Sequence, residues 1–226
     1  MRLNALFAVG LPLLVSISGS VLAGRPGRVA DTVHNLSVSG PGRIKAVKET
    51  RICIFCHAPH TKSPAGQLWN RNLPMGPFLT IETGGGSAGP ETSNQPNGAS
   101  KMCLSCHDGT LALGAVLSSR KPIELTGTST GTIPPGSRGF IGRDLRGMHP
   151  ISIRVTPEVI ARHAKSAMWL VPLKQMKSDP DVKLDRSDRI QCTTCHDPHD
   201  DSNYASSGIH FYTKKRFSDA CVVCHR

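Results

Sequence analysis

The chain has 226 residues, and 27 Lys and Arg against 16 Asp and Glu give it a formal net charge of +11. Aromatic residues make up only 4% of it, and 22 Gly and 17 Pro interrupt it, so a conventional core of large apolar side chains is not expected. The scarcity of aromatic side chains for base stacking also argues against a nucleic-acid partner, in spite of the positive charge. The length fits one large domain or two small ones.

Residues 1–23 have the pattern of a secretory signal peptide. Arg2 supplies a positive charge, an apolar run extends from Leu6 to Val15, and Val21-Leu22-Ala23 forms a small-residue cleavage signal. We therefore expect an exported protein whose mature chain begins near Gly24. The apolar run is short for a bilayer span and no later segment is long enough for one, so no membrane span is expected in the mature chain.

Four copies of the pattern Cys-x-x-Cys-His follow the leader, and together they use all 8 cysteines. In this pattern the two thiols can bond to the vinyl groups of a haem, while the adjoining His ligates the iron. The sequence therefore predicts four haem c groups. The expected covalent attachment residues are Cys53, Cys56, Cys103, Cys106, Cys192, Cys195, Cys221 and Cys224, and the expected proximal ligands are His57, His107, His196 and His225.

Other uses of the cysteines explain the pattern less well. Zinc could be bound by paired Cys-x-x-Cys runs, but a zinc site leaves the His that follows each run unexplained. Disulfides suit an exported chain, but a framework of two-residue loops repeated in every motif is not expected. Methionine could replace a distal His and raise the reduction potential; the candidates are Met75, Met102, Met148, Met168 and Met176.

The histidines and the motifs form a series that occurs twice. Each series has an isolated upstream His, then a Cys-x-x-Cys-His-x-Pro-His run, then a plain Cys-x-x-Cys-His run. The first lies roughly in residues 31–120 and the second roughly in residues 145–226. The repetition predicts two dihaem modules within one tetrahaem domain, residues 24–226, and leaves open whether the modules share a core.

A haem iron held by two imidazoles needs one further His beyond the motif His. Positions that recur in both series are the expected distal ligands, and these are His34, His60, His149 and His199. His163 and His210 have no counterpart in the other series. A His three residues beyond a proximal ligand projects from the same face of a helical turn, so His60 and His199 are each expected to ligate a haem other than their own motif's.

The fold is expected to be mostly irregular coil with short α-helices at the motifs and little β-structure, wrapped around a stack of haems. The apolar stretch Asp108–Val116 is consistent with a further short helix. Residues 155–173 contain the best candidate for an ordinary helix, with Pro157 near its start and Pro172 towards its end.

The runs CIFCHAPH, LWN, CLSCHDGT, MHPIS, CTTCHDPH and CVVCH resemble those of exported multihaem c-type cytochromes of the doubled-CXXCH type. More narrowly, the chain resembles the tetrahaem subunits of extracellular cytochrome nanowires. That resemblance implies low-spin haems with two His ligands in a continuous stack, with one distal ligand sometimes supplied by a neighbouring subunit. It implies an electron carrier rather than an enzyme, located in an extracellular filament or in the periplasm.

Two questions stay open at this level. His34 lies near the mature N-terminus, so it could cap the terminal haem of a neighbouring copy in a head-to-tail homopolymer, or it could ligate a haem in its own chain. The protein could also be a discrete periplasmic shuttle between redox partner proteins. A multihaem reductase is a further alternative, but it needs an open iron position, and the histidines exceed the positions to be filled.

Overall fold

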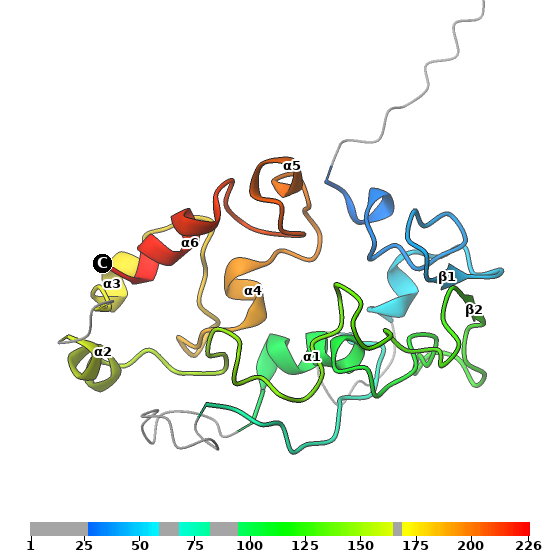
Figure 1. The fold of residues 1–226 in the computed structure, drawn as a ribbon, viewed down its shortest axis with the longest axis horizontal. Coiled ribbons are helices and arrows are strands. Elements are labelled where there is room, and N and C mark those ends of the chain that lie inside the picture. Colours follow the sequence, from blue (N-terminus) through cyan, green and yellow to red (C-terminus); the bar gives the residue numbers. More distant parts are fainter. Residues whose placement is uncertain (1–26, 59–67, 82–94, 165–168) are drawn as a thin grey trace, which may run out of the picture.

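A computed structural model of the protein describes residues 27–58, 68–81, 95–164 and 169–226. The expected leader and His60 lie outside these residues, so nothing is said of their structure. As predicted, the described chain is mostly irregular, with short helices and one small sheet. It is elongated: the sheet lies at one end and the C-terminus at the other (Figure 1).

Each motif carries a short helix, which confirms the expectation for these positions. The helices are the 3₁₀ turns η1 (Val29–Asp31) and η2 (Cys53–Phe55), and α1 (Gly98–His107), α2 (Pro157–His163), α3 (Leu173–Met176), α4 (Cys192–Cys195), α5 (Tyr204–Ser207) and α6 (Phe217–Cys224). Strand β1 (Lys45–Ala46) pairs antiparallel with β2 (Leu125–Thr126), with Lys45 opposite Thr126. No helix in the described ranges is long and apolar enough to cross a membrane.

The helix expected within residues 155–173 begins as predicted but is shorter. Thr156 caps α2 by accepting a hydrogen bond from the Val159 amide at 3.3 Å, and Pro157 follows at the first helical position. This helix ends at His163. Pro172 was expected near the end of the same helix, but it instead precedes α3 as its N-cap residue, where its missing N–H costs no hydrogen bond.

The helix expected at Asp108–Val116 is absent, because these residues form turns around a buried side chain. Arg71 donates hydrogen bonds to the carbonyl oxygens of Ala112 at 2.9 Å and Leu113 at 2.6 Å. Carbonyls that converge on one guanidinium are not aligned along a helix axis, where each would accept the i+4 amide. The prediction from apolar composition was therefore wrong here.

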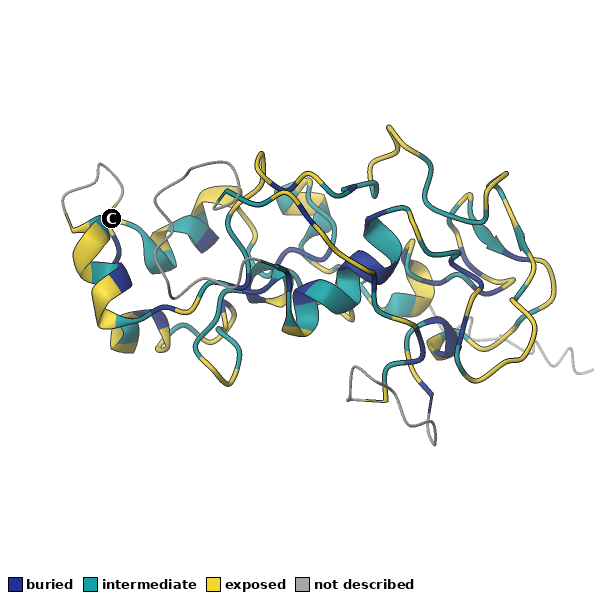
Figure 2. Cartoon of the chain, turned by 90° about the horizontal axis from the view of Figure 1, so that it is seen from below, coloured by how far each residue is buried: buried dark blue, intermediate teal, exposed yellow. Residues whose placement is uncertain are grey.

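Apolar side chains do not gather in a single core. In the described residues they form four separate clusters, and each contains a motif residue or lies beside one. The largest packs α2 and α3 against Cys224, while the others contain Phe55, Leu104 and Ala220. Figure 2 shows the buried residues scattered in short stretches along the length of the molecule.

A buried amide joins the two halves of the chain between α1 and α4. Gln191 is 2% exposed, and its Oε1 accepts hydrogen bonds from the Ser100 hydroxyl at 2.6 Å and the Ser100 amide at 3.2 Å. Its Nε2 donates to Asn97 and Asp185, both at 2.9 Å. The Cys192 amide then donates to the Ser100 hydroxyl at 3.0 Å. The second and third motifs are thus held together by buried hydrogen bonds.

Candidate functional site

The four motifs follow one another in space in the order of the chain. Asn70 links the first motif to the segment after the second, since its side chain donates to the Ile54 carbonyl at 2.6 Å and to the Ser118 hydroxyl at 2.8 Å. The second and third motifs meet at α1 and α4, and Cys195 of the third packs in a cluster with Ala220 of α6. Figure 1 shows α1, α4 and α6 in this sequence towards the C-terminal end.

The cysteine thiols of consecutive motifs are neighbours in the same order. All eight cysteines lie in described residues and none forms a disulfide. Burial and the neighbouring Cys106 thiol raise the pKa of Cys56 to about 12. Burial and the neighbouring Cys224 thiol raise the pKa of Cys195 to about 11. The thiols of Cys103 and Cys192 are neighbours as well, and each shifts the pKa of the other. Consecutive motifs therefore have neighbouring sulfur atoms.

The backbone around the first and third motifs is the same. His57 forms a β-bridge with Trp69, and His196 forms one with Tyr212. The residue before each bridging aromatic, Leu68 or Phe211, has a positive φ of 56° or 59°. In both places this residue's carbonyl accepts the amide that follows the motif His, at 2.8 Å. The first and third motifs, which hold the same place in the two predicted series, therefore share this local backbone.

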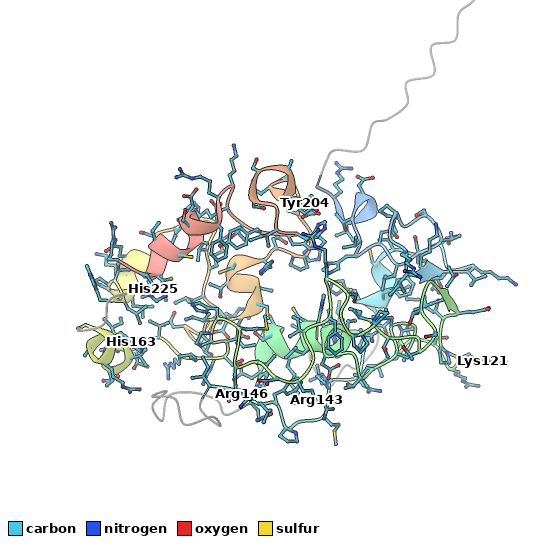
Figure 3. All side chains as sticks on the ribbon, in the orientation of Figure 1. Lys121, Arg143, Arg146, His163, Tyr204 and His225 are labelled. Carbon is cyan, nitrogen blue, oxygen red and sulfur yellow. The ribbon has the colours of Figure 1, made fainter. Side chains whose placement is uncertain are left out.

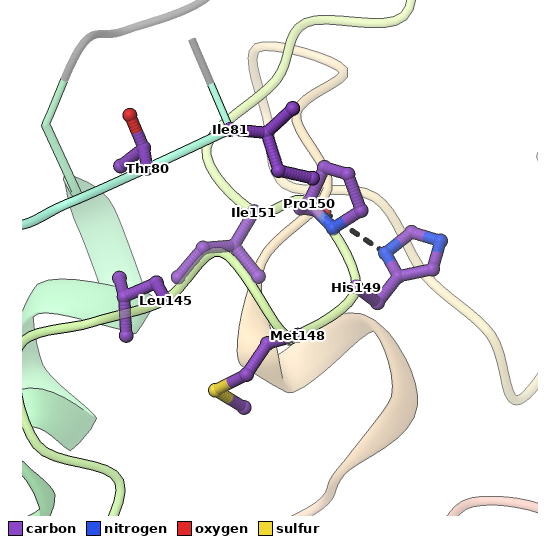
Figure 4. Close-up of a pocket in the computed structure, with 7 residues that line it drawn as sticks. All are labelled: Thr80, Ile81, Leu145, Met148, His149, Pro150 and Ile151. Carbon is purple, nitrogen blue, oxygen red and sulfur yellow. Dashed lines mark hydrogen bonds between the residues drawn. The ribbon is translucent and has the colours of Figure 1, made fainter. Parts of the chain in front are cut away.

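Hydrogen bonds orient several of the predicted ligand imidazoles. The Nδ1 atom of His107 lies 2.7 Å from the Gly139 carbonyl, and that of His196 lies 3.0 Å from the His210 carbonyl. The Nδ1 atom of His149 lies 2.9 Å from the carbonyl of Pro150 (Figure 4). A carbonyl at Nδ1 selects the tautomer that leaves Nε2 with a lone pair for a metal.

Three motif histidines each face an imidazole from elsewhere in the chain. His107 faces His34 with ring centroids 6.0 Å apart, and His225 faces His149 at 6.2 Å. These two pairs have ring planes 64° and 68° apart. His57 faces His199 at 6.1 Å, with planes only 18° apart. Each predicted distal His in the described residues thus faces one motif His.

The spacing of these pairs fits a six-coordinate iron. Bonds of about 2.0 Å from a metal to two imidazole nitrogens, each about 1.1 Å from its ring centroid, place the centroids about 6.2 Å apart. The three observed separations lie between 6.0 and 6.2 Å. Rings in van der Waals stacking are closer, as for Tyr204 and His210 at 3.8 Å. The three separations therefore leave room for one metal atom between the two rings of each pair.

His34 is held firmly within its own chain. Its ring stacks on Phe211 at 4.1 Å, with the planes 13° apart. Loss of solvation on burial, together with His107, lowers its pKa to about 4, although a hydrogen bond with the Pro198 backbone opposes the shift. A neutral imidazole is the form that can ligate a metal. This geometry agrees with the second of the two roles considered for His34, ligation in its own chain.

The two histidines without a counterpart have other contacts. The Nδ1 atom of His210 lies 2.8 Å from the Asp201 carboxylate, and its ring stacks on Tyr204. The Nδ1 atom of His163 lies 2.9 Å from the Val159 carbonyl, one turn earlier in α2. Figure 3 shows His163 at the same end of the molecule as His225. The predicted partner that remains for His196 is His60, which lies outside the described residues.

Two buried polar atoms near the motifs also fit a haem. The indole Nε1 of Trp69 and the hydroxyl of Thr213 have no hydrogen-bond partner in the described protein. Trp69 packs against His57 with ring centroids 6.0 Å apart, and the Thr213 amide donates to the Cys195 carbonyl at 3.0 Å. Buried donors normally have an acceptor, and a haem carboxylate at these motifs would supply one. The residues present therefore fit the group.

Sequence reasoning missed three residues that shape these sites. Arg71 and Gln191 are polar residues without a motif, and their burial depends on segments distant in the chain. Phe211 is an ordinary aromatic in the sequence, yet it stacks on His34. Of the three, only Arg71 had a signal in the sequence, because it directly follows the Leu-Trp-Asn run beside the first motif.

Comparison with known protein families gives a match at the C-terminal end of the chain. A family model described as "Doubled CXXCH motif" matches residues 186–226, which include the third and fourth motifs. This motif is a feature of c-type cytochromes, so the match indicates covalently bound haem and suggests electron transfer. A search of curated proteins finds none that matches the chain.

Proposed function

We propose that the chain carries four covalently bound haems, each with two His ligands, and transfers electrons between them. The observation that carries this proposal is the set of three imidazole pairs with centroids 6.0 to 6.2 Å apart. The haem supplies an iron that accepts and releases one electron, and the chain's own residues attach it, ligate it and set its surroundings. The ligands are His57 with His199, His107 with His34, His225 with His149, and His196 with His60.

This pairing connects the two modules. His34 and His149 each serve the plain motif of their own series, whereas His199 of the second series serves the first motif. By the same repetition, His60 of the first series serves the third motif. Two haems are thus each held by both halves of the chain, so the modules form one unit. The haems act as the core and the polypeptide wraps them, which agrees with four small apolar clusters in the described residues.

The order of the motifs supports conduction along the molecule. Sulfur atoms of consecutive motifs are neighbours, and each sulfur marks the edge at which a haem is attached. Haems attached at neighbouring sulfurs would lie close to one another, and electrons could then pass between them in chain order. The ends of the path are the first motif, with exposed Cys53, and the fourth, which includes His225.

We further propose that copies associate end to end in an exported filament, with external acceptors as the destination of the electrons. Exposed apolar side chains occur at both ends of the path. Beside β1 they are Val33, Val38 and Val47, at 41 to 46%, and at α6 they are Trp169, Phe217 and Val222, at 44 to 62%. Joining these surfaces buries apolar area and brings the fourth motif of one copy to the first of the next.

In this assembly His34 stays in its own chain and is not shared between copies, because it is already packed between Phe211 and His107. A discrete periplasmic shuttle has the same haem ligation and differs only in assembly. A multihaem reductase differs in ligation, because it needs an iron position that substrate can reach. The paired imidazoles favour an electron carrier over this enzyme.

The experiment is to express the chain in a host that attaches haem c and exports it. Mass spectrometry of the exported protein should give four haems, and its visible spectrum should be low-spin and unaltered by carbon monoxide. A zinc protein, a disulfide protein or a chain with an open, ligand-binding haem would each contradict the proposal. Light scattering and electron microscopy then distinguish a filament from a shuttle. As a surface test, Phe217→Ser should prevent association, and Leu79→Ser, at an exposed position outside both ends, should not.

A further inference from the structure

Arg71 is a buried cation whose hydrogen bonds are all made within the protein. The side chain is 1% exposed. Its Nε donates to the Ser105 hydroxyl at 3.3 Å, and its two terminal nitrogens donate to backbone carbonyls at 2.6 to 3.4 Å. These acceptors belong to Ser105, Ala112, Leu113 and Ala115. None of them is a carboxylate, so the hydrogen bonds orient the guanidinium without neutralising its charge.

The charge lies between the first two motifs. The preceding residue, Asn70, donates its amide to the Cys56 carbonyl at 2.9 Å and its side chain to the Ile54 carbonyl at 2.6 Å. Ser105, which accepts from the guanidinium, lies between Cys103 and Cys106 in α1. Arg71 is therefore fixed to the first motif through its backbone and to the second through its side chain.

One buried carboxylate lies beside the second motif. Asp108 is 3% exposed and directly follows His107 in the chain. It accepts hydrogen bonds from the Thr110 amide and hydroxyl, both at 2.9 Å, and its Oδ2 lies 3.9 Å from the Nε of Arg143. The second motif therefore has a carboxylate next to its proximal ligand in the chain, in addition to Arg71.

We propose that Arg71 raises the reduction potential of the haem attached at Cys53 and Cys56, and makes the first motif the favoured resting place for electrons in this half of the chain. The inference rests on the proposed function. Reduction adds one electron to a site, so its charge falls by one and a nearby fixed cation stabilises the reduced state. Because Arg71 is buried, salt screens this effect only weakly. Asp108 offsets part of the same effect at the second motif.

A purely structural role is the competing explanation, since the guanidinium also organises residues 112–115. The two roles separate when charge and hydrogen-bond geometry are changed independently. Arg71→Met removes the charge, whereas Arg71→Lys keeps the charge but loses the planar array of donors. If the role is electrostatic, the reduction potential changes when the charge is removed and stays the same when the charge is kept, even if the protein becomes less stable.

The test is a potentiometric titration of the holoprotein with soluble one-electron mediators, with individual haems resolved by NMR. Arg71→Met should lower the potential at the first motif by about 59 mV, a tenfold change in the one-electron equilibrium, and leave the fourth motif unchanged. The matched control is Arg146→Met, because Arg146 is exposed and paired with Asp144 at 2.7 Å. It should change neither potential.

A variant with four haems and unaltered potentials would overturn the inference but leave the proposed function intact. A wild-type protein without haem would instead overturn the proposed function. If Arg71→Met does not fold, Arg71→Lys decides the question. A potential retained in a less stable protein supports the inference, and a tenfold fall despite the retained charge contradicts it.

Discussion

The imidazoles of His57 and His199 face each other with centroids 6.1 Å apart and ring planes 18° apart, although they belong to the first and third motifs. This pair crosses the boundary between the two repeated series. The other two pairs of predicted ligands each remain within one series, and their ring planes are 64° and 68° apart. An iron ligated by both His57 and His199 would therefore link the two halves of the chain.

The pair predicts a specific defect when its distal member is removed. His199→Ala should leave the haem at Cys53 and Cys56 covalently attached but five-coordinate and high-spin, because the thioether bonds do not depend on the distal ligand. Mass spectrometry should still count four haems, while the visible spectrum gains a high-spin component that binds carbon monoxide. The control is His163→Ala, which should stay fully low-spin. A low-spin spectrum in His199→Ala would contradict the pairing.

His34 offers a second test, which also separates its two possible roles. If it ligates in its own chain, His34→Ala should open the haem at Cys103 and Cys106 even in dilute, dissociated protein. The stacking partner gives a milder change, since Phe211→Leu leaves the ligand in place but removes the ring contact at 4.1 Å. A His34→Ala protein that is low-spin when dissociated and altered only on association would support ligation between copies instead.

The contact between the halves can be weakened without altering any ligand. Gln191→Ala removes the acceptor of both Ser100 bonds and leaves buried donors unsatisfied, so we expect a loss of about 1–3 kcal/mol in the free energy of unfolding. Urea unfolding monitored by circular dichroism would measure it. Gln175→Ala changes the same residue type at an exposed position in α3, and it should have little effect. Equal stabilities for the two variants would show that the Gln191 contacts are dispensable.

Acid should weaken the C-terminal half through Asp179. Burial raises the pKa of this carboxyl, but hydrogen bonds from Lys214 and from the amides of Val182 and Asp181 outweigh it and lower the pKa below 3.8. Its stabilising contribution is therefore complete above the unfolded value and is lost as the pH falls through the folded one. Asp179→Asn should make urea unfolding less dependent on pH between about pH 6 and about pH 3.

The exposed pair of Asp144 and Arg146 supplies the comparison for that experiment. Its two side chains are 52% and 51% exposed, so water and salt screen it. Asp144→Asn should change the pH dependence of urea unfolding in acid only slightly, and by even less when salt is added. An equal effect from both substitutions would count against a special role for Asp179.

Much of the organisation could be predicted from the sequence because it is local. The motif spacing predicted short helices at η2, α1, α4 and α6, and the low aromatic content predicted a mostly irregular chain. The start of α2 followed from Pro157. These features depend on neighbouring residues, which a sequence displays directly.

Contacts between distant segments could not be predicted in the same way. The apolar run after the second motif was expected to be helical, but Arg71 draws its carbonyls inward instead. Nothing near Gln191 in the sequence indicates that its side chain will accept a hydrogen bond from Ser100. The repetition singled out His199 as a ligand for another motif, but only the folded chain brings it to His57.

Electron paramagnetic resonance of the oxidised holoprotein tests the central claim most directly, because the signal of a low-spin haem depends on the angle between its two imidazole planes. The 18° pair should give an ordinary rhombic signal, and the 64° and 68° pairs should give strongly anisotropic ones. In His199→Ala part of the rhombic signal should be replaced by a high-spin signal, while the strongly anisotropic signals persist. A wild-type spectrum dominated by high-spin iron, or a His199→Ala spectrum identical to that of the wild type, would contradict the account.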